Sequence, residues 1–168
     1  FPEAYHIRAI VLWKQGDLDQ AIVDWDKTLE IAPGDWPALG EMKKTMIQVL
    51  ALRGENRIND NDLKGAMIDF DRAVELFPDL PSPYTSRGLI FSRSKQYRKA
   101  ILDYSKAVEL DPKVAMSWYN LGYNREMIKD LDGALSAYNR AIELNPDMKL
   151  AYDRRGLLNF RKGRYREA

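Results

Sequence analysis

The chain has 168 residues, 45% of them hydrophobic, which is enough apolar material for a core and too much for a disordered chain. It has no cysteine and a single histidine, His6, which excludes disulfides, thiolate metal sites and multi-histidine metal centres. The net charge of +1 is unevenly divided. Residues 1–80 carry 9 Lys and Arg against 15 Asp and Glu, a net charge of −6, whereas residues 81–168 carry 17 against 10, a net charge of +7.

No apolar run approaches the roughly 20 residues that a membrane span needs, so we expect a soluble protein without a membrane span. The first residue is Phe1 rather than methionine, and no signal-peptide pattern follows it. We therefore expect a processed product or a fragment of a longer protein. The sequence carries no signal of its compartment.

Similar residues recur along the chain with one common period. The recurring prolines are Pro33, Pro78, Pro112 and Pro146. The recurring alanines are Ala21, Ala66, Ala100, Ala134 and Ala168, and four residues after the first four of them stand Trp25, Phe70, Tyr104 and Tyr138. A further series runs Tyr5, Leu39, Tyr84, Trp118 and Tyr152. Every step is 34 residues except one of 45, so we infer an internal 34-residue repeat with 11 additional residues in one copy.

Each period predicts two helices. In the third copy, Tyr84, Gly88 and Phe91 lie at i, i+4 and i+7, so they share one helix face. The polar turn at residues 94–96 is short enough to join antiparallel helices, and Pro112 ends the second helix. The small residues let the backbones approach, while the aromatic side chains fill the remaining space.

We place the copies at about residues 2–35, 36–80, 81–114, 115–148 and 149–168, with the last one incomplete. The 11 additional residues lie between Leu39 and Ala66, and we expect them near residues 50–60, after the first helix of the second copy. The polar residues of that stretch favour a turn, but Leu50, Leu52 and Ile58 would equally allow an extension of the first helix.

The 34-residue period, the aromatic–x₃–Gly pattern, the Ala–x₃–aromatic–x₂–Ala pattern and the terminal proline resemble the tetratricopeptide repeat family. The fourth copy carries the pattern most completely, at Trp118, Leu121, Gly122, Ala134, Tyr138, Ala141 and Pro146. The resemblance covers almost the whole chain, about four and a half units. It implies an all-α, right-handed solenoid of helix-turn-helix repeats that forms a single domain over residues 1–168. The second copy departs from the pattern, because Leu39 and Lys43 stand in the places of the aromatic residue and the glycine.

The resemblance also implies a site, because this family usually binds other proteins in a concave groove formed by its first helices. Transferred residue by residue, the partner-binding positions are Trp13, Lys44, Arg93, Tyr119, Asn120, Tyr123, Arg154, Leu157 and Arg161. Tyr119 and Tyr123 lie at i and i+4 with Asn120 beside them, which suggests aromatic faces for contact and an amide for main-chain hydrogen bonds. Alternatively, the two tyrosines only pack against a neighbouring helix.

One subclass of the family holds the C-terminal carboxylate of chaperones with five polar residues. The corresponding places here read Thr85, Leu89, Asn120, Leu150 and Arg154, so two of the five match. Thr and Leu cannot supply the charged donors that a carboxylate needs. We therefore expect no binding of that type, although Arg154 with Asn120 could still hold one acidic side chain.

Neither a catalytic site nor a metal site is indicated. The sequence has no Gly-rich phosphate loop and no nucleophile elbow, and His6 has no paired acid at an obvious spacing. Asp60, Asp62 and Gly65 resemble a calcium loop only weakly, because Lys64 occupies a ligand position. We expect a protein that is not an enzyme and has no cofactor.

We interpret the chain as a protein–protein interaction scaffold that binds a peptide or helical segment of a partner in its groove during complex assembly. The last copy has a net charge of +5, so a partner acidic at that end is expected. Nucleic acid is disfavoured because the N-terminal half is acidic. Two alternatives stay open, namely a module that self-associates head to tail into a homo-oligomer, and an accessory segment of a larger protein.

Overall fold

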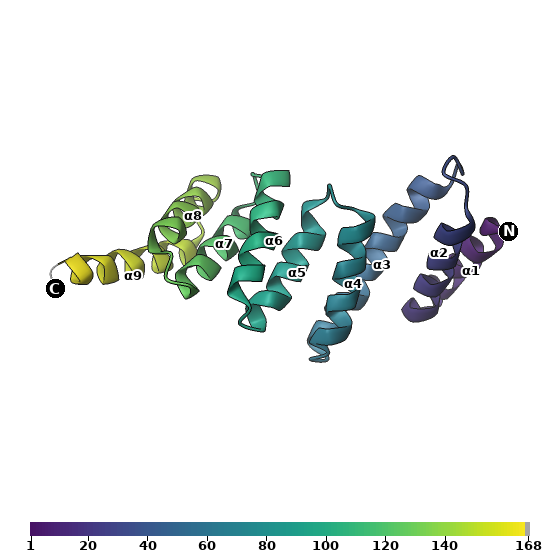
Figure 1. Ribbon diagram of the computed structural model, residues 1–168, viewed down its shortest axis with the longest axis horizontal. Coiled ribbons are helices and arrows are strands. Elements are labelled where there is room, and N and C mark those ends of the chain that lie inside the picture. The colour runs from purple at the N-terminus through teal and green to yellow at the C-terminus, as the bar shows by residue number, and fades with distance from the viewer. Residues whose placement is uncertain (167–168) are drawn as a thin grey trace. The chain divides into compact units, whose positions relative to one another are not determined.

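A computed structural model describes residues 1–166, with side chains to residue 163, and this part of the chain consists of helices and loops (Figure 1). The chain divides into two compact units, Phe1–Pro78 and Asp79–Ala168. Unit 1 contains α1 (Pro2–Gln15), α2 (Leu18–Ile31), α3 (Leu39–Asn59) and α4 (Leu63–Leu76). Unit 2 contains α5 (Pro81–Arg93), α6 (Tyr97–Leu110), α7 (Ala115–Met127), α8 (Leu131–Leu144) and α9 (Lys149–Arg166). The all-α repeat class is confirmed, whereas one domain over residues 1–168 stays a prediction.

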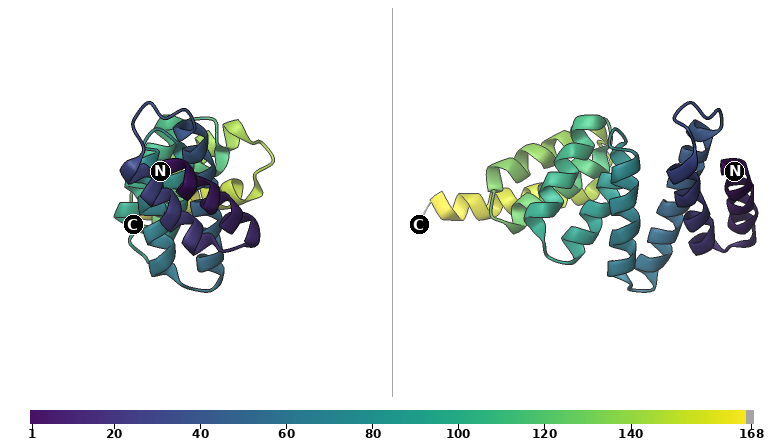
Figure 2. Two further views of the ribbon diagram at one scale, coloured as in Figure 1. Left: turned by 90° about the vertical axis from the view of Figure 1, so that its right-hand side faces the viewer. Right: turned by 45° about the vertical axis from the view of Figure 1, so that its right-hand side comes forward.

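Each unit is built from antiparallel helix pairs, whose members lie side by side in Figures 1 and 2. The pairs are α1–α2, α3–α4, α5–α6 and α7–α8, and α9 packs on α8. The turn inside each pair contains one residue with a left-handed backbone, where φ is between 58° and 88°. These residues are Gly16, Asn61, Lys95 and Lys129. The same backbone geometry therefore closes all four pairs, although only one of them uses glycine there.

The second helix of a pair usually begins with a side-chain cap. Asp17, Asp62 and Asp130 each accept a hydrogen bond from the backbone N–H three residues later, at 2.9 to 3.1 Å. The acidic residues that weakly resembled a calcium loop thus include a helix cap, Asp62. At the start of α6 the corresponding residue is Gln96, whose side chain makes no such bond. That helix consequently begins without the stabilisation that an N-cap supplies.

A glycine of the first helix allows an aromatic ring of the second helix to approach closely. In unit 2, a Cβ atom on Gly122 would lie 2.7 Å from Cε1 of Tyr138, and one on Gly88 would lie 3.2 Å from Cε2 of Tyr104. Both rings are buried. Burial of a large side chain contributes roughly 1.5–3 kcal/mol, more than the roughly 0.5–1 kcal/mol that glycine costs inside a helix. Gly156 of α9 has no such neighbour within 4 Å among the described residues.

In unit 1 the same contact reveals where the 11 additional residues lie. Helix α3 is continuous from Leu39 to Asn59, and a Cβ atom on Gly54 would lie 2.6 Å from Cζ of the buried Phe70. Gly54 therefore has the place in α3 that Gly88 has in α5. The additional residues therefore lie on the N-terminal side of Gly54, in a longer N-terminal part of α3 and a longer loop before it.

This finding corrects the register predicted for the second copy. The insertion does not follow the first helix near residues 50–60, and Leu39 and Lys43 do not hold the places of the aromatic residue and the glycine. Lys44 had been selected from that register. In the corrected register, Glu55 rather than Lys44 occupies this groove position of the repeat. Lys44 instead forms an ion pair with Glu41 on the surface of α3, at 2.7 Å. The error arose because Leu39 and Leu50 each lie one full period from a neighbouring copy, and only packing distinguishes them.

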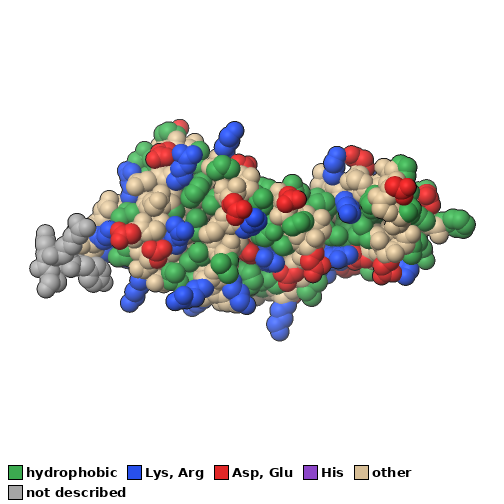
Figure 3. All heavy atoms as spheres, turned by 45° about the horizontal axis from the view of Figure 1, so that its top comes forward, with side chains coloured by type: hydrophobic (Ala, Val, Ile, Leu, Met, Phe, Trp, Pro, Cys, Tyr) green, Lys and Arg blue, Asp and Glu red, His purple; other side chains and the backbone are tan. Residues whose placement is uncertain are grey.

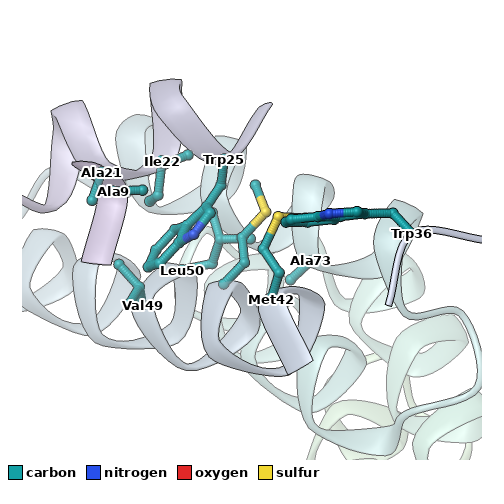
Figure 4. Close-up of a cluster of buried hydrophobic side chains, with 10 residues drawn as sticks. Ala9, Ala21, Ile22, Trp25, Trp36, Met42, Val49, Leu50 and Ala73 are labelled. Carbon is teal, nitrogen blue, oxygen red and sulfur yellow. The ribbon is translucent and has the colours of Figure 1, made fainter. Parts of the chain in front are cut away.

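The core of unit 1 gathers around two tryptophans (Figure 4). Figure 4 shows the indole of Trp25 beside Leu50 of α3, and Trp36 on the other side of the cluster. His6 joins this core, because Trp25 Nε1 donates a hydrogen bond to His6 Nδ1 at 3.2 Å, and the rings of His6 and Trp36 meet edge to face at 5.4 Å. Burial lowers the pKa of His6, which favours the neutral ring that can accept this bond.

Three of the four pairs also share an ion pair between their helices. An arginine of the first helix contacts a buried aspartate 16 residues later, in Arg8–Asp24, Arg53–Asp69 and Arg87–Asp103. Arg8 lowers the pKa of Asp24 by hydrogen bonding, and this effect exceeds the opposing effect of burial. In α7–α8 the corresponding places hold Leu121 and Ala137, which are buried and apolar.

Candidate functional site in unit 2

Unit 2 contains a hollow of about 400 Å³ that is lined by the end of α5, the α5–α6 turn, two tyrosines of α6, and α7. We refer to it as the α5–α7 hollow. Its lining residues are Leu89, Ser92, Arg93, Lys95, Tyr97, Tyr104, Tyr119, Asn120 and Tyr123. Four of the nine are tyrosines, so the hollow offers both ring faces and hydroxyl groups.

Helical periodicity explains how these side chains meet. Leu89 and Arg93 of α5 lie at i and i+4, as do Tyr119 and Tyr123 of α7, so each helix presents one stripe to the hollow. Leu89 is 36% exposed, so part of its side chain is available to the hollow. Each stripe lies on the first helix of its pair. The sequence pattern therefore brings the predicted residues of α5 and α7 together.

The floor of the hollow is set by the repeat itself. Tyr104 reaches the hollow although it is only 1% exposed, because its ring lies on Gly88. Burial raises the pKa of Tyr104 above its usual range, with Asp103 adding to the effect and Arg93 opposing it. Its hydroxyl group therefore stays protonated and available as a donor.

Two of the predicted residues have packing roles as well. The rings of Tyr119 and Tyr138 lie 5.8 Å apart, and Tyr119 is half-buried. Tyr123 lies under the guanidinium group of Arg154, 5.1 Å from the ring centroid. Part of each tyrosine is thus committed to the fold, and both readings of these residues, contact surface and packing, hold in part.

The charge of the hollow has one sign. None of its lining residues is a carboxylate, and two of them, Arg93 and Lys95, are exposed cations. Within the described residues neither Arg93 nor Lys95 forms an ion pair. Figure 3 shows one face of the molecule, on which Lys and Arg side chains are spread over unit 2. The hollow therefore combines apolar surface with positive charge.

A second hollow of about 450 Å³ lies at the other end of α7 and is lined by Glu126, Met127, Lys129, Leu131 and Arg161. The carboxylate of Glu126 is buried, and it accepts hydrogen bonds from the Tyr138 hydroxyl at 2.9 Å and from Arg161 Nη1 at 3.1 Å. Arg154 Nη1 lies 3.8 Å from the same carboxylate. These contacts tie α9 to α7 and satisfy the acid, so Arg154 and Arg161 hold the fold together here.

The remaining predicted residues lie elsewhere. Trp13 is half-buried in unit 1, with its ring 6.4 Å from that of Trp25. Lys44 also belongs to unit 1, and Leu157 is 41% exposed on α9. Thus Arg93, Tyr119, Asn120 and Tyr123 share one hollow, and the other five do not line it.

The sequence analysis missed several residues of the site. Lys95 and Tyr97 lie in or beside a turn, where helical periodicity gives no signal. Lys95 could have been found from its register, because it stands where Gly16 and Asn61 stand in unit 1. Glu126 was missed because its partners Tyr138 and Arg161 come from other helices.

The part of the chain that the structure describes lacks two further features. No helix there is both long and apolar enough to cross a membrane. The same residues contain no group of three or more His, Asp or Glu side chains that could hold a metal ion.

Comparison with known families gave matches over more than half of the chain. Models described as tetratricopeptide repeat match residues 81–114 and residues 2–35 and 115–148. Among curated proteins, none matches the sequence.

Solved structures resemble the chain in fold. The first tetratricopeptide domain of Spaghetti (RPAP3) bound to the HSP90 peptide SRMEEVD is 21% identical with a TM-score of 0.68, over 70% of this chain and 93% of that one. The Sgt2 domain from Aspergillus fumigatus is 22% identical with a TM-score of 0.69, over 73% and 82%. MamA from Desulfovibrio magneticus RS-1 is 21% identical with a TM-score of 0.66, over 96% and 85%.

Proposed function

Since the chain belongs to the tetratricopeptide repeat family, we propose that it is a non-catalytic interaction scaffold that binds a segment of a partner protein through the α5–α7 hollow. The observation that best supports this proposal is the hollow itself, where exposed Leu89 and Arg93 and half-buried Asn120 lie with four tyrosines on packed helices. A site built on helices is formed before the partner arrives, which lowers the entropic cost of binding.

The residues of the hollow suit a peptide. Tyrosine rings provide rigid contact area, and the exposed Leu89 extends the apolar surface. The Asn120 side chain can donate to and accept from a peptide main chain, because its amide carries both an NH₂ group and a carbonyl oxygen. The partner segment would therefore lie across α5 and α7, extended or as a short helix.

The RPAP3 domain is bound to an acidic peptide in its solved structure. In the present chain, three of the five places that hold a chaperone carboxylate in one subclass of the family read Thr85, Leu89 and Leu150. We accordingly propose that this chain shares peptide binding with such relatives but uses other residues for it.

The proposal can be tested by capture of partners from a cell lysate, followed by affinity measurement with the captured protein. Leu89→Ala combined with Asn120→Ala should weaken binding about tenfold or more, because truncating a central contact residue costs roughly 1–2 kcal/mol. The matched control is Leu102→Ala, which removes a leucine that is 70% exposed on α6 and does not line the hollow.

Both variants should keep the helical content and the melting temperature of the wild type, since both truncated leucines are exposed. Equal affinity of the wild type and the hollow variant would refute the hollow as the binding site. Loss of binding in Leu102→Ala alone would indicate that the partner binds at the exposed side of α6 that carries Leu102.

A second candidate function is self-association, which the opposite net charges of residues 1–80 and 81–168 favour. Contacts between opposite charges weaken as salt screens them. Sedimentation at low and at high salt would therefore report assemblies that dissociate with salt, and a monomer at both salt concentrations would rule this function out.

A further inference from the structure

We propose that the α5–α7 hollow holds an acidic side chain of the bound segment, with Arg93 and Lys95 meeting its carboxylate. This inference rests on the proposed function, because it specifies which peptides the hollow selects. The partner would be a peptide in which an aspartate or glutamate stands beside a bulky apolar residue.

The first observation is that these two cations have no acidic partner among the described residues. Arg87 and Lys106 of the same pair do have acidic partners, since Arg87 contacts Asp103 at 2.7 Å and Lys106 contacts Glu109 at 2.8 Å. Arg93 and Lys95 form no ion pair among the described residues, and the lining of the hollow contains no carboxylate. Their positive charge is therefore available to a ligand.

The second observation is the backbone of Lys95. Its φ is 58°, a left-handed conformation that costs a residue with a Cβ atom energy that glycine does not pay. Gly16 adopts the same turn position in the α1–α2 pair with φ of 88°. Lysine takes the same place in α7–α8, as Lys129 with φ of 66°, so this turn accepts a lysine, and at Lys95 it fixes the backbone beside the hollow that the side chain lines.

The third observation is the set of groups around the two cations. Hydroxyl groups of Ser92, Tyr97 and Tyr104 can donate hydrogen bonds to an anion, and Leu89 offers an apolar surface beside them. One guanidinium group can bind one carboxylate in a bidentate manner, and charged hydrogen bonds of this kind are the strong ones.

These observations favour a carboxylate of a protein over two other anions. Phosphorylated peptides are usually held by clusters of arginines, and the hollow contains one. A single-stranded nucleic acid would need a basic groove along several nucleotides, whereas the cations here converge on one hollow. The two cations and the hydroxyl groups of the hollow therefore fit the side chain of a glutamate or an aspartate in a peptide.

The test uses fluorescence anisotropy with four pools of short labelled peptides. All pools have the same apolar positions, and they differ only in their polar residue, which is Glu, Gln, Lys or phosphoserine. A labelled single-stranded oligonucleotide is the fifth probe. The Glu pool should bind about tenfold more tightly than the Gln pool at low salt, and high salt should remove most of the difference.

Two variants with matched controls locate the effect. Lys95→Gly relieves the left-handed strain, so the protein should fold at least as stably as the wild type, yet its affinity for the Glu pool should fall about fivefold to tenfold. Asn61→Gly is the control, because it relieves the same backbone strain in unit 1. Arg93→Gln should act like Lys95→Gly, whereas Arg98→Gln, an exposed arginine of α6 outside the hollow, should leave the affinity unchanged.

The outcomes separate this inference from the proposed function. If the Glu and Gln pools bind equally and Leu89→Ala weakens both, peptide binding stands and the acidic subsite is overturned. If the phosphoserine pool or the oligonucleotide binds while the Glu pool does not, the assignment to a carboxylate is overturned. If no pool binds, or if Leu89→Ala changes none of them, the proposed function fails together with the inference.

Discussion

The pairs α5–α6 and α7–α8 have the same backbone but distribute their charges differently. Both place an aromatic ring on a glycine, Tyr104 on Gly88 and Tyr138 on Gly122. The α5–α6 pair buries the ion pair Arg87–Asp103 and leaves Arg93 and Lys95 unpaired at its end. The α7–α8 pair has apolar residues in the place of the ion pair.

The α7–α8 pair instead buries an acid, Glu126, near the end of its first helix, and arginines of α9 neutralise it. These two pairs therefore share the ring-on-glycine contact, while their charges differ without a change in the helix pairing. Function is therefore to be sought where a charge is left unpaired. The two hollows differ in this respect, because the second one contains the buried acid Glu126, whereas the α5–α7 hollow contains cations and no acid.

The largest effect is expected from breaking the ion pair that distinguishes the two pairs. Asp103→Ala leaves the mostly buried Arg87 without this partner and should lower the free energy of unfolding by about 2–3 kcal/mol. Arg87→Leu combined with Asp103→Ala copies Leu121 and Ala137 from α7–α8. It should recover to within about 1 kcal/mol of the wild type, because apolar residues often replace a buried ion pair at little cost.

Urea unfolding of the wild type and both variants measures these differences. If the double variant is no more stable than Asp103→Ala alone, the two pairs are not interchangeable and the comparison fails.

The next effect concerns the glycines. A methyl group on Gly122 would lie 2.7 Å from Tyr138 and 3.2 Å from the carbonyl oxygen of Ala134, so Gly122→Ala should destabilise the protein by about 1–2 kcal/mol. Gly156→Ala should stabilise it by about 0.5–1 kcal/mol, because no described residue outside its own helix lies within 4 Å. Thermal melting followed by circular dichroism reports both signs, and equal effects at the two glycines would contradict the packing described here.

A smaller gain is expected from giving α6 the cap that α8 has. Gln96→Asp offers a carboxylate to the backbone N–H of Lys99, which now donates to the carbonyl oxygen of residue 96 at 3.0 Å, and should stabilise the protein by about 0.5 kcal/mol. Asp130→Asn serves as the control, since asparagine caps about as well as aspartate. A melting temperature of Gln96→Asp at or below that of the wild type would show that α6 gains nothing from a cap.

The smallest effect concerns the α1–α2 pair, in which the partly buried imidazole of His6 accepts a hydrogen bond from Trp25 and can be protonated. Burial lowers the pKa of His6 below its ordinary value of 6.5, so the unfolded chain binds a proton more readily than the folded one. The stability that the neutral ring contributes is present above pH 6.5 and is lost as the pH falls through the lowered pKa. The melting temperature should therefore decline slightly over this range.

His6→Asn supplies the comparison for this pH dependence. The asparagine oxygen can accept the hydrogen bond from Trp25 Nε1 in place of Nδ1, and it does not titrate. Its melting temperature should be flatter over the same pH range. An equal slope in the variant and the wild type would assign the decline to other groups.

Much of the fold was predictable from the sequence because small and aromatic residues at a 34-residue period allow one kind of packing. The second copy was not, since Leu39 and Leu50 satisfy the spacing equally well and only the contact between Gly54 and Phe70 decides between them. The Arg–Asp ion pairs could have been predicted from the sequence, because Arg8, Arg53 and Arg87 each precede an aspartate by 16 residues.

The candidate site was predictable only along its helices. Arg93, Tyr119, Asn120 and Tyr123 follow from helical spacing, and that they contact a partner stays a prediction. Lys95 and Tyr97 were not found, because a turn has no periodicity that says where its side chains point. The burial of Glu126 was not found either, because it depends on arginines of α9 that the sequence places 28 and 35 residues later.

The central claim is that an unpaired charge in the α5–α7 hollow marks the surface where a partner binds. Amide chemical-shift mapping of the whole chain with the tightest Glu peptide tests it most directly. We expect shifts to concentrate at Leu89, Arg93, Lys95 and Asn120, and we expect Lys95→Gly to need about fivefold to tenfold more peptide to produce them. Shifts confined to unit 1, or to the side of α6 that carries Leu102, would contradict it.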